Sequence, residues 1–292
     1  MERQFYLPPM NLDLFISKAK STKGIILIHR KVKVHVMSKV TFQNIQTIGH
    51  LIHETKLYQQ FHYPEMLVRY DSNFIKLKQM PSLPAFMEAE TYLRDFHLQH
   101  GQHHVKFIFP ENEKPEEALM NHFRKQDYEL GFLELYAIQP NQFPMVAANP
   151  DIHVYPVEGK HVKEFLALRY EQDLQFGQEF ADQRVRLTRR QLNDPAMMQL
   201  IAYYQGVPAG SVDVIIADET VEIDGLDVKE SFQRKGIGSR LQQFIMHTFP
   251  SKTVILVADG EDTPREMYQR QHYRYLGFQY EVQKIFPVAV AR

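Results

Sequence analysis

Apolar residues in the second half of the chain follow two spacings in turn, which predicts strands and helices. Alternating or continuous short apolar runs are typical of strands, whereas spacing at i, i+4, i+7 and i+8 is typical of an amphipathic helix. Strands are expected at 152–157, 197–204, 210–216, 221–228, 253–258 and 277–286, and helices at 160–176, 179–192, 236–249 and 264–272. The order along the chain is therefore β-α-α-β-β-β-α-β-α-β.

The first half has a less regular pattern. Helices are expected at 12–19, 42–61, 85–99 and 115–125, and strands at 24–29, 31–36, 66–70, 74–80, 104–109 and 131–138. The strands at 66–70 and 74–80 would form a hairpin around Asp71. Residues 139–150 contain three prolines and no apolar period, which is typical of a linker. We therefore expect two domains, 1–140 and 151–292, joined by a linker at 141–150.

A similar segment occurs near the end of each half. Residues 123–132 can be aligned with residues 268–278 with one gap, and each segment follows an apolar strand, acidic residues and a proline that opens a helix. Strand, proline, helix and Gly-Phe recur in the same order, which predicts a tandem duplication of one fold. Chance similarity between two amphipathic helices is the alternative.

Composition limits the class of protein. The chain has 292 residues, of which 44% are hydrophobic and 24% charged, as in soluble globular proteins. A net charge of −1 gives no reason to expect a nucleic-acid or membrane partner, and the first residues do not resemble a signal peptide. The absence of cysteine excludes disulfides, thiolate metal ligands and a cysteine nucleophile, so we expect a cytoplasmic protein.

The strongest chemical signal lies where the strand expected at 221–228 is followed by the helix expected at 236–249. The connecting sequence is Gln233-Arg-Lys-Gly-Ile-Gly238. Glycines let a ligand approach the backbone, and the free N–H groups at the start of a helix favour an anion, so this loop could bind a pyrophosphate. It lacks the Gly-Lys-Ser/Thr of a Walker A loop and the third glycine of the dinucleotide fingerprint. A plain glycine-rich start of a helix is the alternative.

The loop and the order of elements together resemble the GNAT superfamily of N-acetyltransferases, whose cofactor loop reads Gln/Arg-x-x-Gly-x-Gly/Ala. The resemblance covers residues 151–292 and implies an α/β (α+β) class: a tandem GNAT-like fold with a mixed β-sheet flanked by helices, in which the C-terminal copy is active. It implies acetyl-CoA as co-substrate and no metal. The residues that it assigns to acetyl-CoA are Leu226, Asp227, Val228, Gln233, Arg234, Lys235, Gly236, Ile237, Gly238 and Ser239.

The first half departs from this pattern where its own loop would lie. Pro81 and Pro84 remove N–H donors, no glycine allows close approach, and Glu88 would repel phosphate. We expect this half to be a degenerate GNAT-like domain that packs against the second half and walls a substrate cleft.

Acetyl transfer to an amine needs a base for the amine and an acid for the leaving thiolate. In family members with a strand glutamate as base, it lies eleven residues before the Gln/Arg of the loop, which selects Glu222, with Asp224 as substitute. The family acid is the tyrosine of Tyr-x-x-x-Gly-Phe, which selects Tyr268 although His272 stands at the glycine. Counting back from the later Gly-Phe pair selects Tyr273 instead. A solvated acid and a half-buried core aromatic are the non-catalytic alternatives.

Acidic and aromatic residues cluster where the first two helices of the second half meet. In the family these helices usually line the acceptor pocket, and the residues are Tyr170, Glu171, Asp173, Phe176, Glu179 and Phe180. Such a set suits an amine or an amino acid, although it also fits an ordinary amphipathic helix pair. The arginines that follow are expected to form a solvated face, with contact to CoA phosphates as the alternative; they are Arg184, Arg186, Arg189 and Arg190.

The resemblance therefore implies an N-acetyltransferase that acts on a small amine, an amino acid or a peptide amine by direct attack in a ternary complex. A relay through an acetyl-cysteine is excluded because the chain has no cysteine. A non-catalytic acetyl-CoA or CoA sensor, or an interaction module, is the alternative. Either a monomer or a homodimer is compatible with the sequence.

Overall fold

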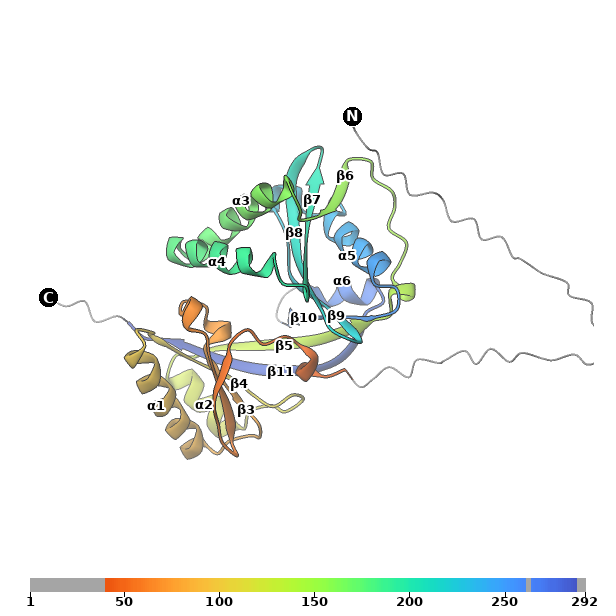
Figure 1. The fold of residues 1–292 in the computed structure, drawn as a ribbon. Coiled ribbons are helices and arrows are strands. Elements are labelled where there is room, and N and C mark those ends of the chain that lie inside the picture. The colour runs from red at the N-terminus through yellow and green to blue at the C-terminus, as the bar shows by residue number, and fades with distance from the viewer. Residues whose placement is uncertain (1–39, 261–263, 288–292) are drawn as a thin grey trace, which may run out of the picture. The chain divides into compact units, whose positions relative to one another are not determined.

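The computed structural model describes residues 40–260 and 264–287 (Figure 1). The elements expected at 12–19, 24–29 and 31–36 lie outside this range. The described strands form one mixed sheet of eleven strands in the order β1-β2-β3-β4-β11-β5-β10-β9-β8-β7-β6. In the described part of the chain, no helix is both long and apolar enough to cross a membrane.

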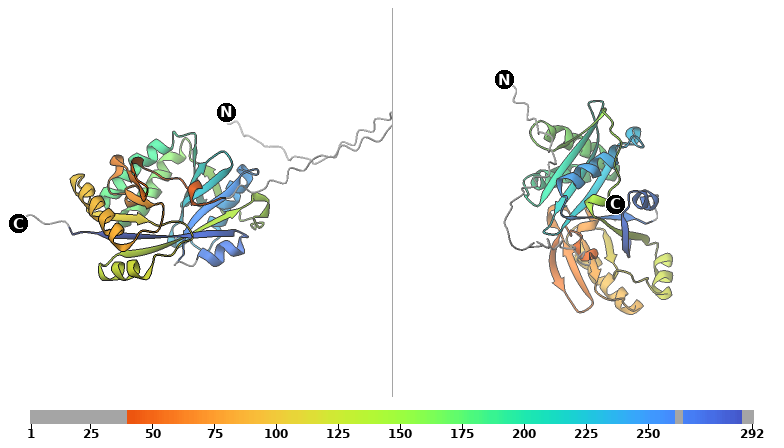
Figure 2. Two further views of the ribbon diagram at one scale, coloured as in Figure 1. Left: turned by 90° about the horizontal axis from the view of Figure 1, so that it is seen from below. Right: turned by 90° about the vertical axis from the view of Figure 1, so that its right-hand side faces the viewer.

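All ten elements expected in the second half are present. They are β6 (Ile152–Pro156), α3 (His161–Asp173), α4 (Gln178–Gln191), β7 (Met197–Tyr204), β8 (Val207–Ile216), β9 (Thr220–Val228), α5 (Ile237–Thr248), β10 (Thr253–Asp259), α6 (Pro264–Arg270) and β11 (Arg274–Ile285). Alternation along β7 shows how the layers form: Leu200 and Ala202 pack in the core with α5, whereas Ile201 packs with α3. The helices α3 and α5 therefore cover opposite faces of the sheet (Figure 2).

The first half contains β1 (His50–Glu54), β2 (Tyr58–His62), β3 (Phe74–Leu77), α1 (Leu83–Gln99), β4 (His104–Ile108), α2 (Glu117–Lys125) and β5 (Glu129–Ile138). The expectations for 74–80, 85–99, 104–109, 115–125 and 131–138 are confirmed. The helix expected at 42–61 is wrong, because this range holds a short 3-10 turn and the β1–β2 hairpin. The strand expected at 66–70, and with it the hairpin around Asp71, is also wrong, because two 3-10 turns occupy this region.

The burial pattern of the β1–β2 hairpin explains why a helix was expected at 42–61. Gln60 and His62 are buried on β2, while Leu51 and Ile52 of β1 are 47% and 45% exposed. The hydrophobic residues of this hairpin therefore do not mark its buried side. Apolar residues in its sequence do not show the alternation that predicts a strand.

The two halves exchange their last strands. Strand β5 of the first half lies between β10 and β11, and β11 of the second half lies between β4 and β5, all in antiparallel pairs. The parallel pair β3–β4 corresponds to the parallel pair β9–β10. The Gly-Phe of each repeat meets the other near the middle of the sheet, where the rings of Phe132 and Phe278 lie 5.3 Å apart. The tandem arrangement is therefore confirmed, with the two copies sharing one sheet.

The ends of α2 and α6 show the same duplication in detail. Asp127 and His272 both have left-handed backbone angles, with φ of 55° and 65°. After each of them a tyrosine N–H donates to a carbonyl five residues earlier, from Tyr128 to Phe123 at 3.0 Å and from Tyr273 to Tyr268 at 2.9 Å. Phe123 and Tyr268 are thus equivalent, and the first half has no hydroxyl where the second half has Tyr268.

Candidate active site

Strands β9 and β10 separate part of the way along their length. They pair in parallel only from Thr220–Thr253 to Ile223–Leu256, although β9 continues to Val228. On its other edge β9 stays paired with β8 as far as Val228, with a bulge at Gly225, whose φ is +55°. Residues 224–228 therefore present one strand edge that β10 does not cover.

The glycine loop lies directly after this open edge. The amides of residues 234–239 have no hydrogen-bond partner among the residues that the structure describes. Gly236 is exposed, has φ of +89°, and has no heavy atom within 4 Å of the position where a Cβ would stand. No side chain caps the start of α5. The loop thus presents a row of amides without a hydrogen-bond partner at the positive end of a helix, and residues 234–236 at its start are exposed.

Side chains of the loop tie it to the neighbouring strands. The Gln233 amide donates to the Val228 carbonyl at 3.2 Å, and the Lys235 ammonium lies 5.4 Å above the Tyr204 ring. A Cβ at Gly238 would stand 3.5 Å from the Leu226 side chain, an ordinary van der Waals distance, so the first turn of α5 lies directly beside β9. The structure therefore brings the predicted cofactor residues at 226–228 and 233–239 together.

The equivalent helix of the first half lacks these features. The Ser82 hydroxyl accepts a hydrogen bond from the Ala85 amide at 3.4 Å, and Pro84 lies in the first turn of α1. One donor is occupied and another is missing, so this end offers fewer groups to an anion.

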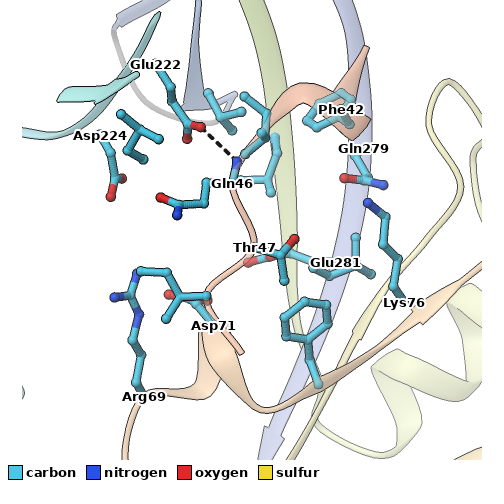
Figure 3. A pocket seen from close by; sticks show the side chains of 17 residues that line it. Phe42, Gln46, Thr47, Arg69, Asp71, Lys76, Glu222, Asp224, Gln279 and Glu281 are labelled. Carbon is cyan, nitrogen blue, oxygen red and sulfur yellow. Dashed lines mark hydrogen bonds between the residues drawn. The ribbon is translucent and has the colours of Figure 1, made fainter. Parts of the chain in front are cut away.

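Glu222 is a buried carboxyl that lines a cavity of about 330 Å³ together with Asp224 and Arg69 (Figure 3). Its Oε2 accepts a hydrogen bond from the Gln46 amide at 2.8 Å, while Oε1 has no partner within the described residues. Burial raises the pKa of Glu222 to about 8, the Gln46 amide opposes this rise, and the charge of Asp224 adds to it. A carboxyl with this pKa can exchange a proton near neutral pH.

The two tyrosines differ in their surroundings. Tyr273 is 5% exposed, and its hydroxyl donates to the Gln242 side chain at 2.8 Å. Tyr268 is only partly buried, and its hydroxyl has no hydrogen-bond partner in the described part of the chain. Burial raises the pKa of both hydroxyls, so both remain protonated at neutral pH. Of the two tyrosines, Tyr268 is therefore the one whose hydroxyl proton is not engaged by another described residue.

A larger cleft of about 830 Å³ opens beside the cavity of Glu222, and Arg69 and Asp71 line both spaces. Four of the six residues expected in the acceptor pocket line the cleft, namely Asp173, Phe176, Glu179 and Phe180. Tyr170 and Glu171 do not line it, and Glu171 forms an ion pair with Lys229 at 2.6 Å. The opposite wall comes from residues 68–71 of the first half and from β11.

The expectation that Arg184 lies on a solvated face is wrong, because this residue is only 7% exposed. Its guanidinium lies 3.4 Å from Asp213 Oδ2, which also accepts a 2.8 Å bond from Arg169. Arg169 further donates to the Gly225 carbonyl at 2.9 Å, so the ion pair fixes the bulge of β9. Sequence reasoning missed Asp213 and Arg69. An acid inside the apolar run of β8 was the available signal for Asp213, whereas nothing local marks Arg69.

Comparisons with known proteins agree with this geometry. Residues 165–278 match the family model described as Acetyltransferase (GNAT) family, and residues 40–136 match a domain of unknown function, DUF5613. A functionally unknown conserved protein from Staphylococcus epidermidis is 33% identical, with a TM-score of 0.79 over 86% of this chain and 100% of that one. No curated protein matches the chain.

Two more distant structures share the fold. A GCN5-related N-acetyltransferase from Kribbella flavida has 13% identity and a TM-score of 0.55, and covers 81% of this chain and 90% of its own. A GCN5-related N-acetyltransferase from Sphaerobacter thermophilus has 14% identity and a TM-score of 0.53, and the match covers 80% of this chain and 78% of that one.

The separated parallel strands, the open glycine loop and the matching family model define a GNAT-type acetyltransferase. Residues 165–278 carry a GNAT acetyltransferase domain, and the described chain has a tandem fold whose two halves share one sheet. The S. epidermidis protein is similar to it over both halves.

Proposed function

We propose that this protein transfers the acetyl group of acetyl-CoA to the amine of a small molecule, an amino acid or a peptide. The observation that carries the proposal is the row of unpartnered amides at 234–239 beside the open edge of β9. Free amides at the start of a helix suit a pyrophosphate, and an uncovered strand edge suits an extended amide-containing chain such as pantetheine. Residues 226–228 and 233–239 would hold the co-substrate.

Glu222 is the proposed base, with Asp224 as substitute on the same strand. An amine is protonated at neutral pH and must lose a proton before it can attack. A carboxylate whose pKa lies near 8 is better suited to take that proton than one of ordinary pKa. Because the Gln46 amide holds Oε2, Oε1 is the oxygen that receives the proton, directly or through a water.

The remaining steps balance without a covalent enzyme intermediate. The amine lone pair attacks the thioester carbonyl carbon, a C–N bond forms, and the C–S bond breaks with its electron pair going to sulfur. The thiolate then takes a proton, for which we propose Tyr268 as donor. The attacking nitrogen gives up its second proton as the amide forms, and this proton, passed on by water, restores the Tyr268 hydroxyl. The products are the acetylated amine and CoA.

We further propose that catalysis belongs to residues 151–292 and that residues 1–140 form a non-catalytic copy. The first half has a capped helix start at Ser82 and a phenylalanine at 123 in place of Tyr268. Its contribution is the wall of the acceptor cleft at 68–71.

The test is release of CoA from acetyl-CoA in the presence of a panel of amines. A thiol reagent reports only CoA, because the protein has no cysteine. We expect turnover with at least one acceptor and a loss of roughly a hundredfold in Glu222→Gln, as for removal of a general base. Glu219→Gln, an exposed acid just before β9, is the matched control and is expected to leave the rate unchanged. Stabilisation by acetyl-CoA without turnover on any acceptor would refute the enzymatic proposal in favour of a CoA sensor.

A further inference from the structure

We propose, on the basis of the function proposed above, that the acceptor carries a carboxylate as well as its amine, and that Arg69 and Arg184 bind this carboxylate. The acceptor would then be an amino acid or a peptide with a free carboxylate within reach of its amine. One of the two arginines comes from each half of the chain.

Arg184 is a buried cation with incomplete pairing. Its only hydrogen bond among the described side chains is the long 3.4 Å contact to Asp213 Oδ2, and this oxygen is already engaged by Arg169 at 2.8 Å. One carboxylate therefore serves two guanidinium groups. Arg184 also lines the large cleft, so its remaining N–H groups are available to a ligand there.

Arg69 brings a second unpaired cation to the same cleft. Its Nη1 is buried and has no hydrogen-bond partner among the described residues. Arg69 and Arg184 both line this cleft, and their like charges repel each other. Burial lowers the pKa of Arg184 and the charge of Arg69 lowers it further, while Asp213 opposes this change. A bound carboxylate would relieve this repulsion and can accept paired N–H donors from guanidinium groups.

The acids around the cleft do not remove this need. Asp71 is paired with Lys106 at 2.5 Å. Burial raises the pKa of Asp173 and the charges of Arg169, Arg184 and Arg69 lower it, but its buried Oδ2 has no hydrogen-bond partner among the described residues. The other acids that line the two spaces are Glu179 of α4, Glu281 of β11, and Glu222, Asp224 and Asp227 of β9. Most of them lie on β9 beside the proposed reaction site, where an ammonium group would be held.

Arg69 connects the two ends of the proposed acceptor site. It lines the cavity that contains Glu222 (Figure 3), and it also lines the cleft that contains Arg184. A molecule with an amine near Glu222 and a carboxylate near Arg69 would therefore meet acidic groups at one end and guanidinium groups at the other. This arrangement gives the first half of the chain a role in substrate selection.

The experiment compares acceptors in pairs that differ only in the carboxylate, such as an amino acid and its amide. We expect the wild-type protein to prefer the acid, and Arg69→Gln to raise KM for the acid roughly tenfold to a hundredfold, as for loss of a charged hydrogen bond. KM for the amide is expected to stay the same. Arg186→Gln on the exposed face of α4 is the matched control, and Arg184→Gln is a second variant that should act in the same way.

Equal use of the acid and the amide by the wild-type protein would overturn this inference and leave the acetyltransferase proposal intact. An equal effect of Arg69→Gln on both acceptors would also overturn it. If no amine is acetylated, the proposed function fails, and the same acid–amide pairs are then titrated calorimetrically against the protein. Preferential binding of acids that is lost in Arg69→Gln would support the site, and equal binding would refute it.

Discussion

Replacing Glu222 by glutamine tests whether this buried carboxyl is held protonated. Burial raises the pKa of Glu222 from 4.5 to about 8. In the unfolded chain the same group ionises near its ordinary pKa. At a pH between the unfolded and the folded pKa, the unfolded state therefore binds fewer protons than the folded state. The wild-type protein is therefore expected to lose stability as pH rises from about 5 to about 8. At 1.36 kcal/mol per pH unit, the rise in pKa corresponds to at most about 5 kcal/mol.

Glutamine at this position cannot ionise, and its side-chain oxygen can still accept the hydrogen bond from Gln46. The free energies of unfolding of the two proteins are expected to be similar near about pH 5 and to differ by several kcal/mol near about pH 9, with the variant more stable. Urea denaturation at both pH values measures this difference. Glu219→Gln removes the same charge from an exposed position and controls for net charge.

The same ionisation is expected to govern activity. The base must be deprotonated, so kcat/KM of the wild-type protein should rise with pH and level off above a midpoint near pH 8. The reasoning would be refuted if the stabilities of the variant and the wild-type protein changed in parallel from acid to alkaline pH. Glu222 would then ionise at its ordinary pKa despite its burial.

Three further predictions concern the support of the site. Arg169→Met removes the main partner of Asp213 and is expected to cost about 3–5 kcal/mol in urea denaturation, whereas a loss below about 1 kcal/mol would contradict the role of this ion pair. Gly236→Ala places a side chain on a residue with left-handed backbone angles and is expected to lower the free energy of unfolding by about 1–2 kcal/mol. It is also expected to weaken the binding of acetyl-CoA in calorimetric titration, and an unchanged affinity would argue against binding by the amides at 234–239. Tyr268→Phe is expected to lower kcat about a hundredfold with little change in stability. Tyr273→Phe is expected to lower stability by about 1 kcal/mol and spare kcat, and the opposite result would exchange their roles.

The second half of the fold could be predicted from sequence because each of its elements carries a local signal. Helix α5 begins after glycine and continues with apolar residues at helical spacing, of which Leu241 and Ile245 are fully buried. The hairpin β1–β2 gave no such signal, because its buried residues, Gln60 and His62, are polar, and its apolar residues Leu51 and Ile52 are exposed. Its position in the sheet depends on pairing with β3, which only the tertiary structure provides.

Some residues of the candidate site could be found from the sequence, whereas their interaction partners could not. The loop at 233–239 was found from its glycines at a junction of strand and helix, and Glu222 was selected by the resemblance to GNAT enzymes whose strand glutamate lies eleven residues before that loop. The partners of these residues were not found. Gln46 lies 176 positions from Glu222 in the sequence, and Arg169 lies 44 positions from Asp213. No local pattern relates residues at such separations.

The sequence by itself determined the order of elements in the second half, the duplication and the open loop before α5, because these depend on short-range periodicity and on the backbone freedom of glycine. The tertiary structure decided that β5 and β11 exchange places, that Arg184 faces a cleft and not solvent, and that Arg69 reaches this cleft from the other half. These outcomes depend on which surfaces are buried against each other and on which charges then lack a partner, and both arise only when distant parts of the chain pack together.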